Sequence, residues 1–268
     1  MPRLGSFFGQ SSLTGWSRYF DYQVAVAREA VIPWLRDRMP LEGVRIGDFG
    51  CHEGGMLHAF REDTGVAGGL GLELNSALVE RSPFVADGSF RLEVGDLATA
   101  RGEETFGLVL LHDVLEHVGD VEAVVRASAA RLAPGGRLFV SFPPYRSPFG
   151  GHQQYAAGAA RALPYVHHLP KRLFLRVARP AATEYMTAAD ALEDLRSVRR
   201  TRLTLARAEA AFAGAGLRAE HCELFLVRPE HSLRYGVPTV GAGPLGAIPV
   251  LRELIVSGAY YLLAPSCS

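Results

Sequence analysis

The feature that most constrains the fold is the alternation of short apolar runs with helical segments between residues 44 and 142. Strands are expected at 44–49, 67–72, 90–94, 106–111 and 137–142, and helices at 56–61 and 121–132. Strands that alternate with helices at this spacing indicate a doubly wound, mostly parallel α/β sheet. Right-handed crossovers then place the carboxyl ends of the strands at one edge, where a small ligand is expected to bind.

The chain is expected to divide into an N-terminal helical segment, residues 1–40, and a main α/β domain, residues 41–268. Apolar and aromatic residues recur at helical spacing over 16–38, beginning with Trp16. Residues 143–200 interrupt the βα rhythm and are expected to form a cap over the substrate. A helix at 203–213, a strand at 219–227, and a further helix and closing strand within 248–263 are expected to follow.

Composition and charge exclude several classes of protein. The chain has 268 residues, of which 48% are apolar, so a sizeable core is expected and disorder is not. Its 28 basic residues balance 28 acidic ones, so nucleic acid is not an expected partner. Three scattered cysteines favour a reducing, cytoplasmic location. No stretch suits a signal peptide or a membrane span, and the oligomeric state is not readable.

The segment Ile46-Gly47-Asp48-Phe49-Gly50-Cys51-His52-Glu53-Gly54-Gly55 joins the first strand to the first helix. Glycines in such a turn let the backbone approach a ligand closely, although ordinary βα turns also contain them. Glu73 ends the second strand, Asp96 follows the third, and His112 ends the fourth. Because all three should lie at the same edge as the glycine turn, they indicate one binding crevice. A carboxylate after the second strand can accept hydrogen bonds from a ribose diol.

This set of motifs resembles the class I S-adenosylmethionine-dependent methyltransferases, in particular the branch of ubiquinone- and menaquinone-biosynthesis enzymes. The resemblance covers roughly residues 40–142, and it implies a Rossmann-like, seven-stranded, mostly parallel sheet with S-adenosylmethionine as cofactor. The matching pieces are Asp48-Phe49-Gly50-Cys51-His52-Glu53-Gly54, Gly71-Leu72-Glu73-Leu74, Gly95-Asp96-Leu97, Leu111-His112-Asp113-Val114-Leu115-Glu116-His117-Val118 and Leu132-Ala133-Pro134-Gly135-Gly136-Arg137-Leu138.

The resemblance implies roles for the glycine turn. Gly50, Cys51 and the neighbouring backbone would bind the methionine end of the cofactor, and Asp48 would orient the turn or hold the amino group through water. The family usually has glycine where this chain has His52, so His52 is expected to face the substrate channel or solvent.

The resemblance also implies roles for the later strand ends. Glu73 would bind the ribose hydroxyls, with Leu74 beside the adenine. Asp96 would hold the adenine amine, and Leu97 would contact the ring through its backbone N–H. His112 would lie beside the sulfonium.

The start of the expected cap carries the candidates for contact with the acceptor. Tyr145, His152 and Tyr155 could orient or deprotonate a nucleophile, or could simply be structural. His152 is the first candidate for a catalytic base, followed by His112 and His117. A small-molecule acceptor is expected, with an O, N or C nucleophile, possibly in secondary metabolism.

A metal site is not expected. Glu116 and His117 are adjacent, and adjacent residues on a helix point to different faces, so they are poorly placed to share an ion with His112 and Asp113.

Two other functions stay open. A nicotinamide-dependent dehydrogenase would share the fold, but its G-x-G-x-x-G fingerprint is not in register with the turn that begins at Asp48. A non-catalytic protein could keep the same fold to bind or regulate a partner.

Overall fold

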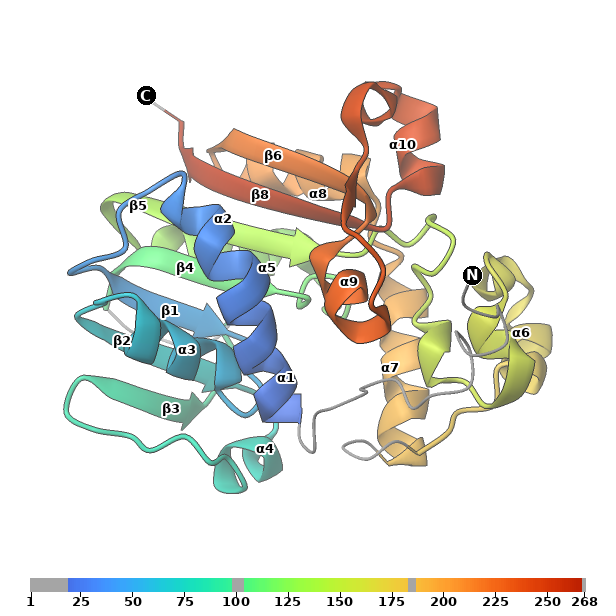
Figure 1. Ribbon diagram of the computed structural model, residues 1–268, viewed down its shortest axis with the longest axis horizontal. Helices are drawn as coiled ribbons and strands as arrows, with labels where there is room; N and C mark the ends of the chain where they lie inside the picture. The colour runs from blue at the N-terminus through green and yellow to red at the C-terminus, as the bar shows by residue number, and fades with distance from the viewer. Residues whose placement is uncertain (1–18, 98–103, 183–186, 267–268) are drawn as a thin grey trace.

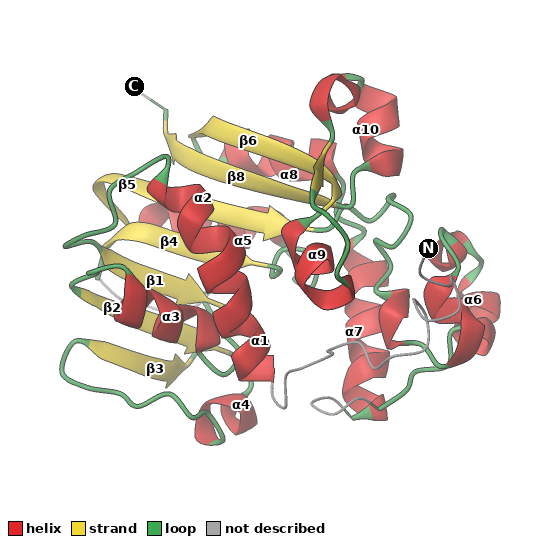
Figure 2. Ribbon diagram, in the orientation of Figure 1, coloured by secondary structure: helices red, strands yellow, loops and turns green. Residues whose placement is uncertain are grey.

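The computed structural model describes residues 19–97, 104–182 and 187–266, and these residues form one eight-stranded sheet (Figures 1 and 2). The order of the strands is β3-β2-β1-β4-β5-β8-β6-β7. The strands are β1 (Arg45–Phe49), β2 (Gly68–Glu73), β3 (Phe90–Val94), β4 (Phe106–His112), β5 (Leu132–Phe142), β6 (Leu217–Val227), β7 (Val240–Gly241) and β8 (Gly258–Pro265). The doubly wound α/β prediction is confirmed. The number of strands differs by one, because the two-residue edge strand β7 pairs with β6.

The direction of the strands fixes where a site can form. The five strands from β3 to β5 run parallel, whereas β8 is antiparallel to both β5 and β6. Because β8 is reversed between them, β6 runs in the same direction as β5. The carboxyl ends of β1 to β6 therefore lie on one edge, next to α7 and α9 in Figure 1. This edge is the one that the sequence predicts for ligand binding.

Helices cover both faces of the sheet. Side chains alternate along β4, so Leu108 and Leu110 pack in one buried cluster and Val109 and Leu111 in the other. Helices α1 and α3 lie over the first face, and α5 and α8 over the second (Figure 2). The helices are α1 (Tyr19–Val26), α2 (Ile32–Arg36), α3 (Gly55–Asp63), α4 (Ser76–Glu80), α5 (Val121–Ala130), α6 (Lys171–Val177), α7 (Ala188–Thr201), α8 (Leu205–Gly214), α9 (Pro229–Tyr235) and α10 (Pro249–Ile255).

The first helix belongs to the main core. A π-helical turn, Ala27–Val31, joins α1 to α2 without a break, and Val26, Val31 and Leu35 are buried against the sheet cluster. Trp16, which the sequence places at the start of this helix, lies outside the described residues.

The segment between β5 and α8 forms a cap beside the carboxyl edge. It contains three short 3₁₀ turns, α6 and α7, and it has a small buried cluster of its own around Phe174 and Leu195. Figure 1 shows α6 and α7 beyond the ends of the parallel strands. None of the helices in the described ranges combines the length and apolar character that crossing a bilayer requires.

Candidate functional site

The turn after β1 has the backbone shape that the sequence predicts for close approach of a ligand. Gly50 has φ +79°, and a Cβ built there would lie 2.6 Å from Cγ2 of Val114, so a larger residue does not fit. His52 also has a positive φ, +55°, which is unusual for a residue with a side chain. The backbone thus has at His52 the conformation that glycine favours.

The N–H groups of Gly50 and Cys51 are not directed at a ligand. Both donate to the carbonyl oxygen of Leu72, at 2.8 and 3.1 Å. The pairing of β1 with β2 thus extends past the end of the strand. The prediction that Gly50, Cys51 and the neighbouring backbone bind the methionine end of a cofactor therefore cannot rest on these two N–H groups, and it stays a prediction. The contribution of Gly50 that the structure shows is its positive φ and the close packing of Val114 against the turn.

Glu73 lies at the end of β2, against the glycine turn. Its Oε2 accepts from the backbone N–H of His52 at 2.9 Å, and its Oε1 accepts from the N–H of Asn75 at 3.0 Å. Two backbone donors hold the carboxylate beside the turn, and each oxygen keeps a further lone pair for a hydroxyl donor.

Asp48 is buried under the same turn. Its side chain is 2% exposed, and its Oδ2 has no hydrogen-bond partner among the described residues. Burial raises the pKa of Asp48 to about 7, and the nearby Glu73 carboxylate also raises this pKa, against the lowering effect of His112. A buried, unpaired carboxyl oxygen is costly, so this atom is suited to a cationic or donor group of a ligand.

The other cofactor candidates lie along the same edge. Leu74 is 69% exposed, beside Glu73, and so has an apolar surface free to cover a ring. Asp96 is half-buried after β3, and Leu97 packs at the margin of the second buried cluster.

His112 belongs to a buried ionic network that the sequence did not reveal. Its Nε2 lies 3.1 Å from Oε1 of Glu230, which also accepts from the hydroxyl of Tyr260 at 2.7 Å. Arg228 donates to Oε2 of Glu230 at 2.6 Å and to both oxygens of Asp113, at 2.7 and 2.9 Å. Burial alone would lower the pKa of His112, but the carboxylates of Asp113 and Glu230 raise it above its ordinary value.

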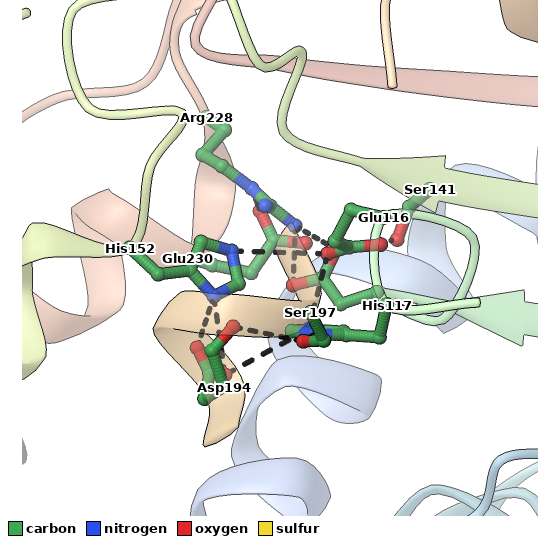
Figure 3. A network of polar contacts seen from close by, with 9 residues as sticks. Glu116, His117, Ser141, His152, Asp194, Ser197, Arg228 and Glu230 are labelled. Atoms are coloured by element: carbon green, nitrogen blue, oxygen red, sulfur yellow. Dashed lines mark hydrogen bonds and ion pairs between the residues drawn. The ribbon is translucent and has the colours of Figure 1, made fainter. Parts of the chain in front are cut away.

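A second cluster lies next to this network, between the turn after β4 and the cap (Figure 3). Nδ1 of His152 is 2.9 Å from Oδ1 of Asp194, on α7. Nδ1 of His117 is 2.9 Å from the hydroxyl of Ser197, one turn further along α7. Glu116 lies between the two imidazoles, with its Oε1 3.9 Å from Nε2 of His117 and 4.0 Å from Nε2 of His152.

The helix assumed at Glu116 and His117 is not observed, although the possible metal ligands among the described residues fall into two groups, with His112 and Asp113 in the other one. Residues 115–117 form a turn and not a helix, so the two side chains converge. Ligand atoms of Glu116, His117 and His152 all lie within 4.8 Å of one another. The expectation that no metal binds stays a prediction.

A cavity of about 110 Å³ opens between these clusters and the glycine turn. It is lined by Tyr19, Tyr22, His52, Asp113, His117, Pro143, Phe149, His152, Gln154, Tyr155, Asp194, Arg228, Glu230, His231, Arg234 and Ser257. Three of its residues, His52, Asp113 and His152, have φ between +54° and +55° although they are not glycine. Such strain persists only where the surroundings impose it, and it is common in binding sites.

His52 forms the boundary between the cavity and the glycine turn. Its ring lies against that of Tyr19, with centroids 4.4 Å apart. Burial lowers the pKa of His52 to about 4, so the ring is neutral at neutral pH.

The three cap candidates separate in the structure. His152 and Tyr155 line the cavity, whereas Tyr145 does not. The Tyr145 hydroxyl donates to the carbonyl oxygen of His167 at 3.2 Å, inside the cap. The geometry of Tyr145 therefore fits the structural alternative.

Sequence reasoning missed Asp194, Arg228 and Glu230. Arg228 and Glu230 follow β6, so a signal existed: charged residues at the end of a further strand of the sheet. Asp194 had no such signal, because it is 42 residues from His152 in the sequence and the two meet only when α7 packs against the start of the cap.

Residues 16–202 match a protein family described as methyltransferase domain. A curated ubiquinone biosynthesis O-methyltransferase of Xylella fastidiosa is 31% identical over 113 residues. This alignment covers 41% of the present chain and 46% of that protein, so the match spans about half the length of the curated relative.

Two solved structures share the fold. A chain from the Haloferax volcanii complex that contains the Trm112 methyltransferase activator has a TM-score of 0.53 at 16% identity, covering 91% of the present chain and 98% of that chain. The PH0226 protein of Pyrococcus horikoshii has a TM-score of 0.51 at 13% identity, covering 92% of each chain.

Proposed function

Because the chain belongs to the family of methyltransferase domains, with S-adenosylmethionine as the family's cofactor, we propose that it transfers a methyl group to a small-molecule acceptor held in the cavity. The observation that carries the proposal is the position of the cavity. It lies directly beside the glycine turn, where His52 borders both, and it contains an imidazole from the cap. The family match also favours a methyltransferase over the dehydrogenase alternative.

The residues at the carboxyl edge fit the cofactor. The absent side chain of Gly50 lets Val114 pack closely against the turn, and the unpaired Oδ2 of Asp48 is suited to the amino group, directly or through water. Glu73 can accept from two ribose hydroxyls, and the exposed Leu74 can cover the adenine. Asp96 keeps its proposed role at the adenine amine, and Leu97 its role at the ring.

The cofactor supplies a methyl group on a sulfonium, which is already a good leaving group. The protein therefore has to align the acceptor, exclude water and, where the acceptor is a hydroxyl, accept its proton. His152 is the proposed base, because its ring lines the cavity. The neutral rings of His52 and His117 add no positive charge beside the sulfonium, since burial lowers the pKa of both.

An oxygen nucleophile is the favoured acceptor atom. The matched curated relative is named as an O-methyltransferase, and a hydroxyl is the acceptor that needs a base such as His152. The aromatic side chains of Tyr19, Phe149 and Tyr155 line the cavity and favour an acceptor with a ring.

The first test is calorimetric titration with S-adenosylhomocysteine. We expect binding by the wild type and at least a tenfold weaker affinity for Glu73→Gln, because the amide accepts with only one oxygen. Glu80→Gln, on the exposed side of α4, is the control and should bind as the wild type does.

The second part of this test identifies the acceptor. Phenols, catechols and amino sugars would be screened by mass spectrometry for the gain of one methyl group. Absence of S-adenosylhomocysteine binding would leave the non-catalytic, partner-binding alternative as the better explanation.

A further inference from the structure

We propose that Asp194, on the cap helix α7, is a positioning residue that holds His152 in the tautomer of a general base, so that docking of α7 completes the acceptor site. The catalytic consequence of this role rests on the proposed methyl transfer. The tautomer itself can be measured whether or not an acceptor is known.

The contact between the two side chains defines the tautomer. The Asp194 carboxylate faces Nδ1 of His152 with both oxygens, at 2.9 and 3.3 Å. Burial alone would raise the pKa of Asp194, but the imidazoles of His152 and His117 lower it below its ordinary value, so the group is ionised at neutral pH. An ionised carboxylate only accepts, so Nδ1 carries a proton, and in the neutral ring the lone pair is on Nε2.

The lone pair on Nε2 is directed toward the cluster that borders the cavity. Figure 3 shows Nε2 on the side of the ring away from Asp194, facing Glu116. The separation of 4.0 Å from Oε1 of Glu116 is too long for a direct hydrogen bond. Nε2 is therefore not saturated by Glu116, and it is the atom proposed to receive the proton of the acceptor.

Glu116 is buried in surroundings that favour its neutral form. It is 1% exposed, and neither of its carboxyl oxygens has a hydrogen-bond partner among the described residues. Burial, followed by the nearby Asp113 carboxylate, raises the pKa of Glu116 well above its ordinary value. A protonated Glu116 does not compete with Asp194 for the proton of His152.

Helix α7 holds both imidazoles of the cluster. Besides the contact between Asp194 and His152, Ser197 contacts Nδ1 of His117 at 2.9 Å. One turn further, the Thr201 hydroxyl donates to the carbonyl oxygen of Val118 at 2.7 Å, which fixes α7 to the turn after β4. The base is therefore assembled from two parts of the chain that meet only in the folded molecule.

Other ionisable groups act on this pair and bear on any pH dependence. They come from the turn after β4, from the cap, from α1, from the glycine turn, and from β6 and α9. They are Asp113, Glu116, His117, Tyr155, Tyr19, Tyr22, His52, Arg228, Glu230, His231 and Arg234.

In the proposed step, the proton of the acceptor hydroxyl passes to Nε2 of His152. The electron pair left on oxygen forms the bond to the methyl carbon as the methyl–sulfur bond breaks, and the thioether leaves. Asp194 stays ionised and stabilises the imidazolium that results.

The experiment compares Asp194→Asn with Glu193→Gln, a neighbouring residue on α7 whose side chain is 60% exposed. The tautomer of His152 would be measured by ¹⁵N NMR of the full chain with S-adenosylhomocysteine, with His152→Gln to assign the signal. We expect a proton on Nδ1 in the wild type and in Glu193→Gln, and a mixture of tautomers in Asp194→Asn.

Turnover with a catechol acceptor gives the second readout. We expect kcat for Asp194→Asn to fall at least tenfold, and its acidic limb to move to lower pH because the imidazole is no longer stabilised in its charged form. Affinity for S-adenosylhomocysteine should stay within twofold. Asp194→Glu, which keeps the charge, should restore most of the lost kcat, and it remains informative if Asp194→Asn folds poorly.

Three results would overturn the proposal: a proton on Nε2 in the wild type, an unchanged pH profile in Asp194→Asn, or activity that a chelator abolishes and Zn²⁺ restores. The last result would identify Glu116, His117 and His152 as a metal site. Failure of the proposed function is separate, since it would appear as absence of S-adenosylhomocysteine binding.

Discussion

At the scale of single residues, the site depends on buried carboxyl groups whose pKa values shift in opposite directions according to their neighbours. Asp48 and Glu116 have raised pKa values because burial is not offset by a cation. Asp194 has a lowered pKa because two imidazoles face it. Residue type alone did not distinguish these cases, since the sequence shows each of them only as an acidic residue.

Asp48 should make stability depend on pH. Its pKa in the folded state is about 7, above the unfolded value, so the folded state binds the extra proton and loses stability as the pH rises from about 4 to 7. We expect Asp48→Asn to be more stable than the wild type at pH 8, by more than about 1 kcal/mol, and to gain little at pH 4. Urea unfolding at both pH values measures this.

The same variant should bind S-adenosylhomocysteine more weakly, because the amide lacks the negative charge proposed to face the amino group. Equal stability of the two proteins at pH 8 would argue that Asp48 is paired in solution.

At the scale of elements, the Arg228 network joins the end of β4 to β6, β8 and α9. Arg228 and Glu230 are 3% exposed, and the Tyr260 hydroxyl comes from the central strand β8. This contact set could not be predicted, because it needs the order of the strands, in which the last strand lies between β5 and β6.

Removing Arg228, which follows β6, should lower the free energy of unfolding far more than removing Arg218, a surface arginine at the start of the same strand. Arg228→Ala leaves Asp113 and Glu230 buried without their cation, so we expect a loss of about 3–5 kcal/mol. Arg218→Ala breaks an exposed contact with Glu220 and should cost no more than about 1 kcal/mol. Chemical denaturation would compare them, and similar losses would contradict a structural role for the network.

At the scale of the whole molecule, the alternation of strands and helices predicted the edge at which the site forms. It predicted Glu73 and Asp48 there because parallel strands end together. It did not predict which cap residues reach the cavity: Tyr155 lines it and Tyr145 does not, although both are aromatic and close in sequence. That difference arises from the path of the cap, which local patterns do not determine.

A substitution in the buried cluster of the cap should destabilise the cap without destabilising the sheet. Phe174 is fully buried in the separate cluster of the cap, so Phe174→Ala should cost about 3–5 kcal/mol there. We expect faster hydrogen exchange over 150–200, a lower kcat/KM for the acceptor, and affinity for S-adenosylhomocysteine within twofold. Faster exchange in β1 and β4 as well would show that cap and sheet unfold as one unit, against the proposed division of the chain.

The position of β8 has a consequence for biosynthesis. Since β8 separates β5 from β6, nascent β6 can pair early only with the short strand β7, and it joins the rest of the sheet after residues 258–265 have been synthesised. Tyr260 arrives with that strand and completes the contacts of Glu230. The parallel strands from β3 to β5 can thus pair before β8 has been made, whereas β6 and β7 join the sheet only once β8 is in place.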